Sequence, residues 1–325
     1  MTIRIPLYGI LLGTLMLVSC GGKQEWITYS DTKADEITSI DHENAKILWY
    51  GTRRGVVKFD KIEGVRQLFD ENQGLADKNV RSVLVDKNNL KWFATAIGLS
   101  TFDGGTNWGA HDIQNEGMPS NDITGIIIDD KSVVWITTGA GIGKYDGKKW
   151  ETINHTKGLL DDVANCIAED ASGRIWVGTS SGLTSYDGTQ WTVYDTSNSP
   201  IGDLSIRTVN VGPDQSIWVG TSRGLARYDG KKWDMFTADS TGLPDNVIKA
   251  VEFGNGQTVW VGTSKGLAHY DGKVWTSFKA GEYPLPSNKI SALRIDSRGN
   301  LWIATEKDGL CVYKAGGVEL VDEEK

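Results

Sequence analysis

The chain of 325 residues is poor in cysteine, with only Cys20, Cys166 and Cys311. Three cysteines are too few for the disulfide framework that stabilises many small secreted domains. Cys166 and Cys311 lie in short apolar runs typical of β-strands, so we expect both to be free, buried thiols. Cys166 is interpreted as a small packing residue rather than as a nucleophile.

Recognisable catalytic and metal-binding patterns are also missing. The four histidines are far apart and show no metal-ligand spacing: His42, His111, His155 and His269. There is no Gly-x-Ser-x-Gly sequence and no phosphate-cradling loop. Residues 170–173 and 296–299 are turns without the ligand density of a calcium loop. We therefore predict no catalytic residue, no metal and no cofactor, although residues converging from distant segments could still form a lyase site.

Positive charge is in short supply. The 34 lysines and arginines are outnumbered by 42 aspartates and glutamates, which gives a formal net charge of −8 at pH 7. A general nucleic-acid-binding protein usually carries a basic surface, so nucleic acid is not expected as a partner. No long run of like charge and no low-complexity segment interrupts the chain.

Long apolar runs are limited to residues 5–18, which follow Arg4. This run is shorter than the roughly 20 residues that a membrane span needs, and its position is typical of a secretory signal. It leads into Leu-Val-Ser-Cys at residues 17–20, which resembles the bacterial lipobox. An ordinary signal peptide with a chance cysteine, or a buried apolar helix, is the alternative interpretation.

The lipobox resemblance implies a lipid anchor. Residues 1–19 would be a lipoprotein signal peptide, Cys20 would be acylated, and residues 20–25 would form a lipidated linker. Two glycines follow the cysteine, with no aspartate at the next position. By analogy with lipoprotein sorting, that arrangement favours the outer membrane.

Tryptophan, in contrast, is abundant and regularly spaced. Seven of the 13 tryptophans stand at intervals of 43, 43, 41, 42, 42 and 42 residues: Trp49, Trp92, Trp135, Trp176, Trp218, Trp260 and Trp302. A repeat of that length with several strand-like runs in each unit is typical of a β-propeller. We predict an all-β, seven-bladed propeller with four-stranded antiparallel blades.

Each repeat contains four short strand-like runs separated by turn residues, here named a to d in chain order. The first tryptophan series lies in run b, and the other six tryptophans precede or begin run d: Trp26, Trp108, Trp150, Trp191, Trp233 and Trp275. A threonine follows the first series three positions later in all seven units. Such regular placement indicates that the tryptophans pack the blades rather than form a binding site.

The run count suggests how the ring closes. There are seven a–b–c sets but eight d-like runs, the first at residues 26–29 and the last at 318–321. Only the first carries the repeat's tryptophan, so we predict that residues 26–29 supply the outer strand of the last blade. Pairing the two chain ends removes exposed sheet edges. The propeller is expected to occupy residues 26–321, with residues 322–325 as a tail.

The recurring pattern Ile-x-x-Leu/Val…Asp-x-x-Gly-x-Leu/Ile-Trp-Val/Ile-Gly/Ala-Thr…Gly-Leu…Tyr-Asp resembles the two-component regulator propeller repeat. Residues 163–187 and 290–313 show it most plainly, and the resemblance covers about residues 26–321. In that family such repeats often form the periplasmic sensor of hybrid histidine kinases that respond to polysaccharides. They also occur in stand-alone exported proteins and in secretion-system components. Because this sequence shows no kinase, no DNA-binding module and no membrane span after the propeller, the resemblance implies a stand-alone exported lipoprotein.

Propeller ligands commonly occupy one end of the central channel, where the d–a and b–c loops lie. Basic residues in the b–c loops and at the start of run a form a candidate ligand-binding rim: Arg53, Arg54, Arg81, Arg207, Arg223, Lys249, Lys265 and Lys307. Such a rim suits an anionic glycan or a carboxylated ligand. The alternative is ordinary solvated loop charge, balanced by acidic residues of the d–a loops.

These observations predict a monomeric, non-enzymatic lipoprotein of the cell envelope that binds an oligosaccharide or an envelope protein. The membrane would be contacted through the lipid on Cys20. A lyase acting on a polysaccharide or small molecule is one alternative, and a scaffold in an envelope or secretion assembly is another. Histidine, tyrosine and acidic side chains converging on the axis would favour the enzyme. An apolar or aromatic patch on one flank would favour a protein partner.

Overall fold

A computed structural model describes residues 23–32, 35–201, 203–256 and 258–320. The expected signal peptide and the lipidation site Cys20 lie outside these described residues. Within the described ranges, no helix has both the length and the apolar character needed to cross a membrane.

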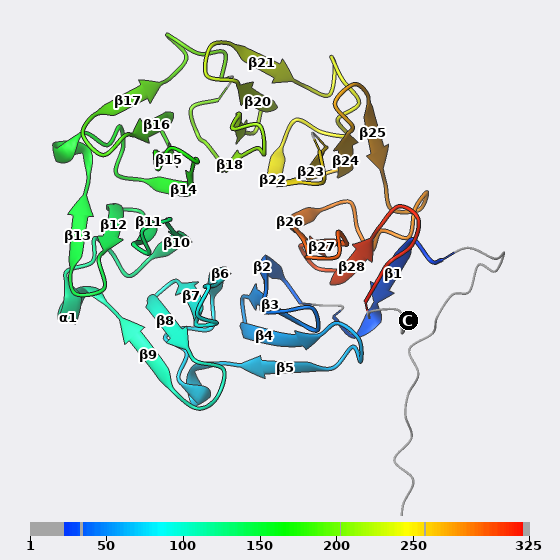
Figure 1. Ribbon diagram of the computed structural model, residues 1–325, viewed down its shortest axis with the longest axis horizontal. Coiled ribbons are helices and arrows are strands. Elements are labelled where there is room, and N and C mark those ends of the chain that lie inside the picture. Colours follow the sequence, from blue (N-terminus) through cyan, green and yellow to red (C-terminus); the bar gives the residue numbers. More distant parts are fainter. Residues whose placement is uncertain (1–22, 33–34, 202, 257, 321–325) are drawn as a thin grey trace, which may run out of the picture.

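Seven four-stranded antiparallel sheets form a ring around a central axis (Figure 1). Blade 1 contains β2 (Ile37–His42), β3 (Ile47–Thr52), β4 (Gly55–Asp60) and β5 (Arg66–Phe69). Blade 2 contains β6 (Val80–Val85), β7 (Lys91–Thr95), β8 (Gly98–Phe102) and β9 (Trp108–His111). Blade 3 contains β10 (Ile123–Ile128), β11 (Val134–Thr138), β12 (Gly141–Tyr145) and β13 (Trp150–Ile153). Blade 4 contains β14 (Ala164–Glu169), β15 (Ile175–Thr179), β16 (Leu183–Tyr186) and β17 (Trp191–Tyr194).

The remaining blades follow the same plan. Blade 5 contains β18 (Thr208–Val211), β19 (Ile217–Gly220), β20 (Leu225–Tyr228) and β21 (Trp233–Phe236). Blade 6 contains β22 (Ile248–Phe253), β23 (Val259–Thr263), β24 (Gly266–Tyr270) and β25 (Trp275–Phe278). Blade 7 contains β26 (Ile290–Ile295), β27 (Leu301–Thr305), β28 (Leu310–Tyr313) and β1 (Trp26–Tyr29). Helical segments in the described chain are short: η1 (Ser30–Thr32), η2 (Glu71–Gln73), α1 (Ile113–Glu116) and η3 (His155–Lys157). The predicted seven-bladed all-β propeller is thus confirmed.

The N-terminal strand closes the ring, as predicted. β1 pairs antiparallel with β28, with Trp26 opposite Tyr313 and Tyr29 opposite Leu310. Figure 1 shows β1, in blue, alongside β28, in red. Pairing the two chain ends gives blade 7 the same four strands as the other blades and leaves no seam.

The C-terminal segment behaves differently from the strand-like run noted in the sequence. Its described part, residues 318–320, forms no strand. Instead, the Val318 amide donates to the Gln24 carbonyl at 2.8 Å, and the Asn300 side chain bonds both backbone groups of Glu319. Val318 and Leu320 also pack on the core between blades 7 and 1. The described part of the segment therefore covers the closure.

The first tryptophan series links each middle strand to the turn before it. In six blades the indole N–H donates to a side-chain oxygen of the a–b turn, at 2.6–3.2 Å: Glu43, Asp86, Asp129, Asp170, Ser216 and Asp296. The residue six positions before the tryptophan is glycine in blades 5 and 6; Trp218 uses Ser216 instead, whereas the Trp260 indole N–H has no hydrogen bond to a described residue. Satisfying the indole N–H makes a buried tryptophan a stable packing unit.

The repeated threonine has an equally specific role. In all seven blades its hydroxyl donates across the b–c loop to the carbonyl of a glycine, at 2.7–3.0 Å. The same oxygen accepts a backbone N–H from within the loop. Because these threonines are buried, the two bonds supply the hydrogen-bond partners that the hydroxyl, the glycine carbonyl and the loop N–H group would otherwise lack.

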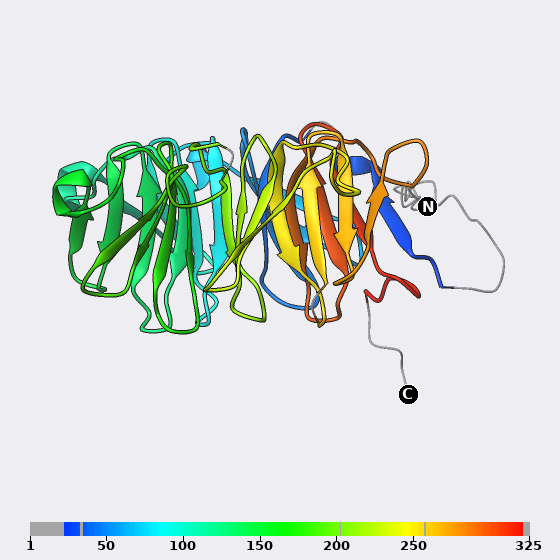
Figure 2. The same ribbon diagram turned by 90° about the horizontal axis from the view of Figure 1, so that it is seen from above.

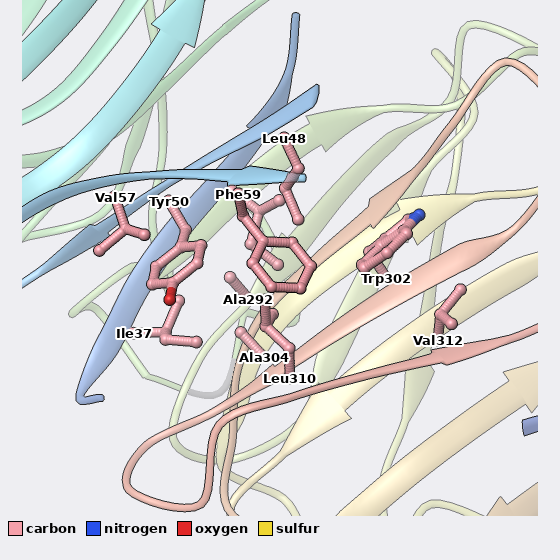
Figure 3. Packing of buried hydrophobic residues seen from close by; sticks show 11 residues of the cluster. Ile37, Leu48, Tyr50, Val57, Phe59, Ala292, Trp302, Ala304, Leu310 and Val312 are labelled. Atoms are coloured by element: carbon pink, nitrogen blue, oxygen red, sulfur yellow. The ribbon is translucent and has the colours of Figure 1, made fainter. Parts of the chain in front are cut away.

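The cores lie between neighbouring blades. Figure 3 shows the cluster where blades 7 and 1 meet, with Tyr50 and Phe59 of blade 1 facing Trp302 and Leu310 of blade 7. Small residues permit this approach; a Cβ atom on Gly220 would lie 2.6 Å from both Ile248 and Thr208. Such close packing explains why the residue before the repeated threonine is small in every blade: Gly51, Ala94, Thr137, Gly178, Gly220, Gly262 and Ala304.

The two cysteines inside the propeller are free. Cys311 is fully buried, as predicted, whereas Cys166, on the inner strand β14, is half-buried. Burial raises the pKa of the Cys166 thiol to about 12. A thiol with that pKa is a poor nucleophile at neutral pH.

Candidate functional site

The propeller has two distinct faces. The b–c and d–a loops form one, here called the mouth face, and the a–b and c–d turns form the other, here called the turn face. The inner strands line the central channel (Figure 1). In six blades a β-bulge inserts one extra residue at the mouth end of the inner strand: Thr38, Arg81, Thr124, Asn165, Lys249 and Ser291. A bulge re-aims the side chain that it carries.

Several bulge residues join one blade to the next. The Thr38 hydroxyl donates to the Val80 carbonyl at 2.7 Å, and the Thr124 hydroxyl donates to Ala164 at 2.8 Å. The Asn165 amide donates to the Ile206 carbonyl at 3.0 Å. These bonds satisfy carbonyls at the free edge of the inner strands, so the threonines and this amide group are structural.

Cations of the predicted rim occupy the same position in blades 2, 5 and 6. Arg81 pairs with Asp122 at 2.7 Å, and Lys249 pairs with Glu306 at 3.4 Å. Arg207, at the equivalent position in blade 5, is exposed, and its guanidinium has no ion pair or hydrogen bond to any described residue. Arg207 is therefore the least neutralised cation at the channel.

The predicted cations of the b–c loops are mostly paired. Arg53 bonds Glu36 at 3.0 Å and Arg54 bonds Asp35 at 3.1 Å. The remaining pairs are Lys265 with Asp245 at 3.4 Å and Lys307 with Glu36 at 3.9 Å. Arg223 is exposed and makes no ion pair within the described chain. Exposed pairs of this kind contribute about 0–1 kcal/mol each, but they reduce the positive potential over blades 1, 6 and 7.

Acidic residues of the d–a loops serve mainly as turn residues. Asp77, Asp161 and Asp203 each accept the backbone N–H two residues further on, at 2.9, 2.9 and 3.2 Å. Asp203 also accepts the Ser222 hydroxyl, which holds the pKa of that carboxyl below its usual range. These carboxylates are engaged in loop structure, and Arg207 and Arg223 remain available on blade 5.

A small cavity surrounds Arg207 at the channel mouth. It has a volume of about 280 Å³ and is lined by Asn165, Ser205, Ile206, Arg207 and Lys249 of blades 4 to 6. This is slightly below the range of about 300–1,000 Å³ that is typical for small-molecule sites. The structure thus brings together two of the eight predicted rim residues, Arg207 and Lys249, in one cavity.

Further along the channel lies a polar group that the sequence interpretation missed. Arg294 donates from Nε to Asp41 Oδ1 at 3.0 Å, and its side chain is 46% exposed. Asp41 also accepts the Val85 N–H at 2.8 Å. Burial raises the pKa of the neighbouring Glu252 to about 7, against the opposing effect of Arg294. Arg294 contacts the same oxygen of Asp41 from Nη2 at 2.9 Å. These two contacts, from Nε and Nη2, fix the guanidinium while leaving part of it open to the channel.

The sequence does contain a signal for the polar group of Asp41, Glu252 and Arg294, because these residues occupy the same position of the repeat. The equivalent inner-strand residues are apolar in blades 2 to 4, namely Leu84, Ile127 and Ala168, and polar in the others: Asn210, Glu252, Arg294 and Asp41. The channel is therefore apolar on the side of blades 2 to 4 and polar on the opposite side. Comparison of this one repeat position across the seven blades would have revealed that the channel has an apolar side and a polar side.

The four histidines do not meet at the channel. Both ring nitrogens of His42 are buried without a hydrogen-bond partner, and its ring lies 6.2 Å from that of Trp302. His111 stacks on Trp92, His269 packs on Trp260, and His155 bonds Asp162 within the d–a loop between blades 3 and 4. The described ranges hold no cluster of three or more His, Cys, Asp or Glu residues suited to a metal ion.

Comparison with known proteins supports the repeat assignment. Residues 158–181 and 284–307 match the two component regulator propeller family. These segments carry the d–a loop, the inner strand and the strand next to it in blades 4 and 7, where the resemblance is plainest in the sequence. No curated protein sequence matches the chain.

Solved structures share the fold. The extracellular domain of a hybrid two component system from B. thetaiotaomicron aligns with a TM-score of 0.77 and 21% identity; it covers 89% of this chain, which spans 41% of that one. A streptogramin B lyase aligns with a TM-score of 0.72 and 12% identity over 89% of this chain and 97% of its own. YCF48 bound to D1 peptide aligns with a TM-score of 0.68 and 15% identity over 91% and 98%. At such identities the likeness establishes the fold, and the site must decide the function. Two segments of the chain thus match the two component regulator propeller family, and the chain folds as a seven-bladed propeller.

Proposed function

We propose that this protein is a non-enzymatic binding module of the cell envelope that takes its ligand at the channel mouth over blades 4 to 6. The observation that carries the proposal is the unpaired guanidinium of Arg207, which lines the mouth cavity together with Lys249. A cation without a protein partner in a concave site favours an acidic ligand group.

The chemistry of the cavity favours an acid-bearing oligosaccharide. Arg207 offers a planar fork of N–H donors that matches a carboxylate, and Lys249 adds a second positive charge. Ser205 supplies a hydroxyl beside these cations for sugar hydroxyls, and Asn165, whose amide nitrogen bonds the Ile206 carbonyl, offers its side-chain oxygen. A uronic acid unit presents a carboxylate and hydroxyls within one ring, which is the combination that these four side chains recognise.

A binding function is supported over a lyase function by the placement of the histidines. Streptogramin B and virginiamycin B lyases share the propeller fold, and one of those structures is an inactive variant with a histidine replaced by alanine. In this chain the ring nitrogens of His42 are buried between blades 1 and 7, His111 lies on the outer strand β9, His269 on β24, and His155 in the d–a loop between blades 3 and 4. None of the four lines the mouth cavity. No histidine therefore stands where a general base would meet a ligand in the mouth cavity.

The envelope location is supported by two observations. The lipobox-like residues 17–20 imply export and acylation of Cys20, which favours a lipid-anchored protein at the outer membrane. Two neighbouring structures are described as extracellular domains of B. thetaiotaomicron regulatory systems. This chain corresponds to the propeller portion of such a protein, and we propose that it acts as a binding module without a kinase.

A peptide or protein partner is the second candidate, because the mouth face also carries apolar residues. Ile97 in a b–c loop is 59% exposed, and Val163 and Leu204 of the d–a loops are 42% and 37% exposed. Exposed apolar side chains on one face favour a protein contact. The YCF48 propeller is described with a bound peptide, so the fold is compatible with this use.

The test of the glycan proposal is a thermal-shift screen of uronic-acid oligosaccharides against neutral oligosaccharides of the same length. A ligand that binds the native state at a concentration 100 times its Kd stabilises the protein by about 2.7 kcal/mol. We expect the melting temperature to rise with the acidic series only. The variant carrying Arg207→Ala and Lys249→Ala should bind at least about tenfold more weakly because it loses both cations, each contributing about 1.5–3 kcal/mol as a charged hydrogen bond.

The matched control is a variant with Arg174→Ala and Lys148→Ala, which removes the same charges from turns on the opposite face. It should retain full affinity. Equal weakening of binding in both double variants would attribute the effect to net charge and contradict the proposed site. No shift with any glycan, together with an envelope protein whose copurification is lost on Ile97→Asp, would replace the glycan with a protein partner.

A further inference from the structure

One position of the repeat changes character at the blades next to the chain ends. It is the last residue of the c–d turn, on the turn face, and it is polar in blades 2 to 5: Asn107, Lys149, Gln190 and Lys232. In blades 6 and 1 the same position is Val274 and Val65. These valines are 61% and 64% exposed, the highest values for large hydrophobic side chains in the described chain. Ile62, in the same turn as Val65, is 39% exposed.

The two apolar turns flank the place where the N-terminal segment enters the propeller. β1 begins at the turn face, because Trp26 lies opposite Tyr313, the last residue of β28. Just before it, the Glu25 and Gln24 carbonyls accept backbone N–H groups from Lys314 and Val318 at 3.0 and 2.8 Å. In Figure 2 the start of β1, in blue, lies at the lower edge of the ring, opposite the edge that carries α1. Blade 7, which receives this segment, stands between blades 6 and 1 (Figure 1).

The distance along the chain to the expected lipid is short. Cys20 precedes Lys23, the first described residue, by three positions. Three residues span at most about 11 Å when fully extended. A lipid on Cys20 would therefore hold the turn face of blade 7 close to the bilayer, and the apolar turns on both sides would meet the same surface.

We propose that the turn face of blades 6, 7 and 1 docks on the lipid bilayer, with Val274 on one side of the anchor and Val65 and Ile62 on the other. This inference rests on the lipid anchor of the proposed function but not on the identity of the ligand. The lipid anchor supplies most of the affinity for the membrane. Because it keeps the propeller at the bilayer, the exposed apolar side chains contact the lipid at a high effective concentration. The polar turns of blades 2 to 5 remain in water, so the molecule tilts and its channel mouth faces away from the membrane.

The test uses full-length lipidated protein reconstituted into vesicles of phosphatidylethanolamine and phosphatidylglycerol. Single probes are introduced by Val65→Cys or Val274→Cys in a Cys166→Ser, Cys311→Ala background and labelled with an environment-sensitive fluorophore. Lys149→Cys and Gln190→Cys occupy the same repeat position in blades 3 and 4 and serve as matched controls. Because the probed valines are exposed, each variant should retain the melting temperature of its background.

We expect spin-labelled lipid to quench the probes at positions 65 and 274 several-fold more than those at 149 and 190. Equal quenching at all four positions would overturn the proposal, as would a mass showing that Cys20 carries no lipid. Crosslinking between copies through positions 65 and 274 in detergent would assign the patch to a second copy and also contradict membrane docking. Loss of ligand binding at the mouth would leave these results unchanged, so the two proposals fail independently.

Discussion

Replacement of Trp302 by alanine should lower the free energy of unfolding by about 3–5 kcal/mol, as expected for truncation of a large, fully buried aromatic residue. Trp302 is completely buried where blade 7 meets blade 1. Its ring stacks on Tyr29 of the closing strand at 5.6 Å and lies 6.3 Å from that of Phe59 in blade 1. The substitution removes packing from both sides of the closure, so the chain ends should separate more readily.

Urea denaturation measures this change, and a phenylalanine pair separates packing from hydrogen bonding. Trp302→Phe retains an aromatic ring but removes the N–H that Asp296 accepts at 3.0 Å. Trp260→Phe makes the same change in blade 6, where the indole N–H has no hydrogen bond to a described residue. Trp302→Phe should therefore cost about 1–3 kcal/mol more than Trp260→Phe. Equal losses would show that the indole–aspartate bond contributes little, and a loss below about 1 kcal/mol for Trp302→Ala would contradict the role of the closure.

Acid should destabilise the protein through His42. Burial, with Lys61 and Arg294 nearby, lowers the pKa of His42 from its ordinary 6.5 to about 3, although Asp296 acts in the opposite direction. In the unfolded chain His42 gains its proton near pH 6.5, while in the folded protein it remains neutral to about pH 3. The contribution of the neutral, buried His42 to the free energy of unfolding is therefore fully present above pH 6.5. It falls by about 1.4 kcal/mol per pH unit as the pH decreases from 6.5 toward 3.

Two glutamates act in the opposite direction. Burial raises the pKa of Glu252 and of Glu169 from 4.5 to about 7, so their contribution is present at low pH and is lost as the pH rises from 4.5 to 7. The free energy of unfolding of the wild type, measured against pH, is the sum of the contributions of His42 and of these two glutamates. The difference between the wild type and His42→Phe isolates the histidine, since both proteins contain the glutamates. We expect the variant to gain roughly 2–3 kcal/mol on the wild type between pH 6.5 and 4.5 in urea denaturation, whereas parallel profiles would refute a buried neutral His42.

The regular parts of this molecule could be predicted because each repeats seven times. The spacing of Trp49 to Trp302 identified the blade count, and the extra tryptophan at position 26 identified the closing strand. Each of these residues makes its contacts within one repeat or with the adjacent one, so a local pattern determines its role. The indole bonds to the a–b turns and the threonine bonds across the b–c loops have the same origin.

The candidate site was harder to predict because pairing across blades decides the charge of the rim. Lys249 meets Glu306 of the next blade, and Arg53 and Lys307 share Glu36. None of these pairs has a fixed sequence spacing that recurs around the ring. The sequence therefore indicates where cations gather but not that Arg207 and Arg223 of blade 5 are left without an acidic partner among the described residues. That distinction depends on the side-chain positions in three dimensions.

Hydrogen exchange of the protein with and without an acidic oligosaccharide is the most direct test of the central claim, that ligand binds at the channel mouth over blades 4 to 6. Backbone amides of residues 203–207 and 246–250 should exchange more slowly in the complex, and those of the turns at 146–149 and 229–232 should be unchanged. Protection confined to the turn face, or protection of the mouth that persists in the Arg207→Ala, Lys249→Ala variant, would contradict the proposed site.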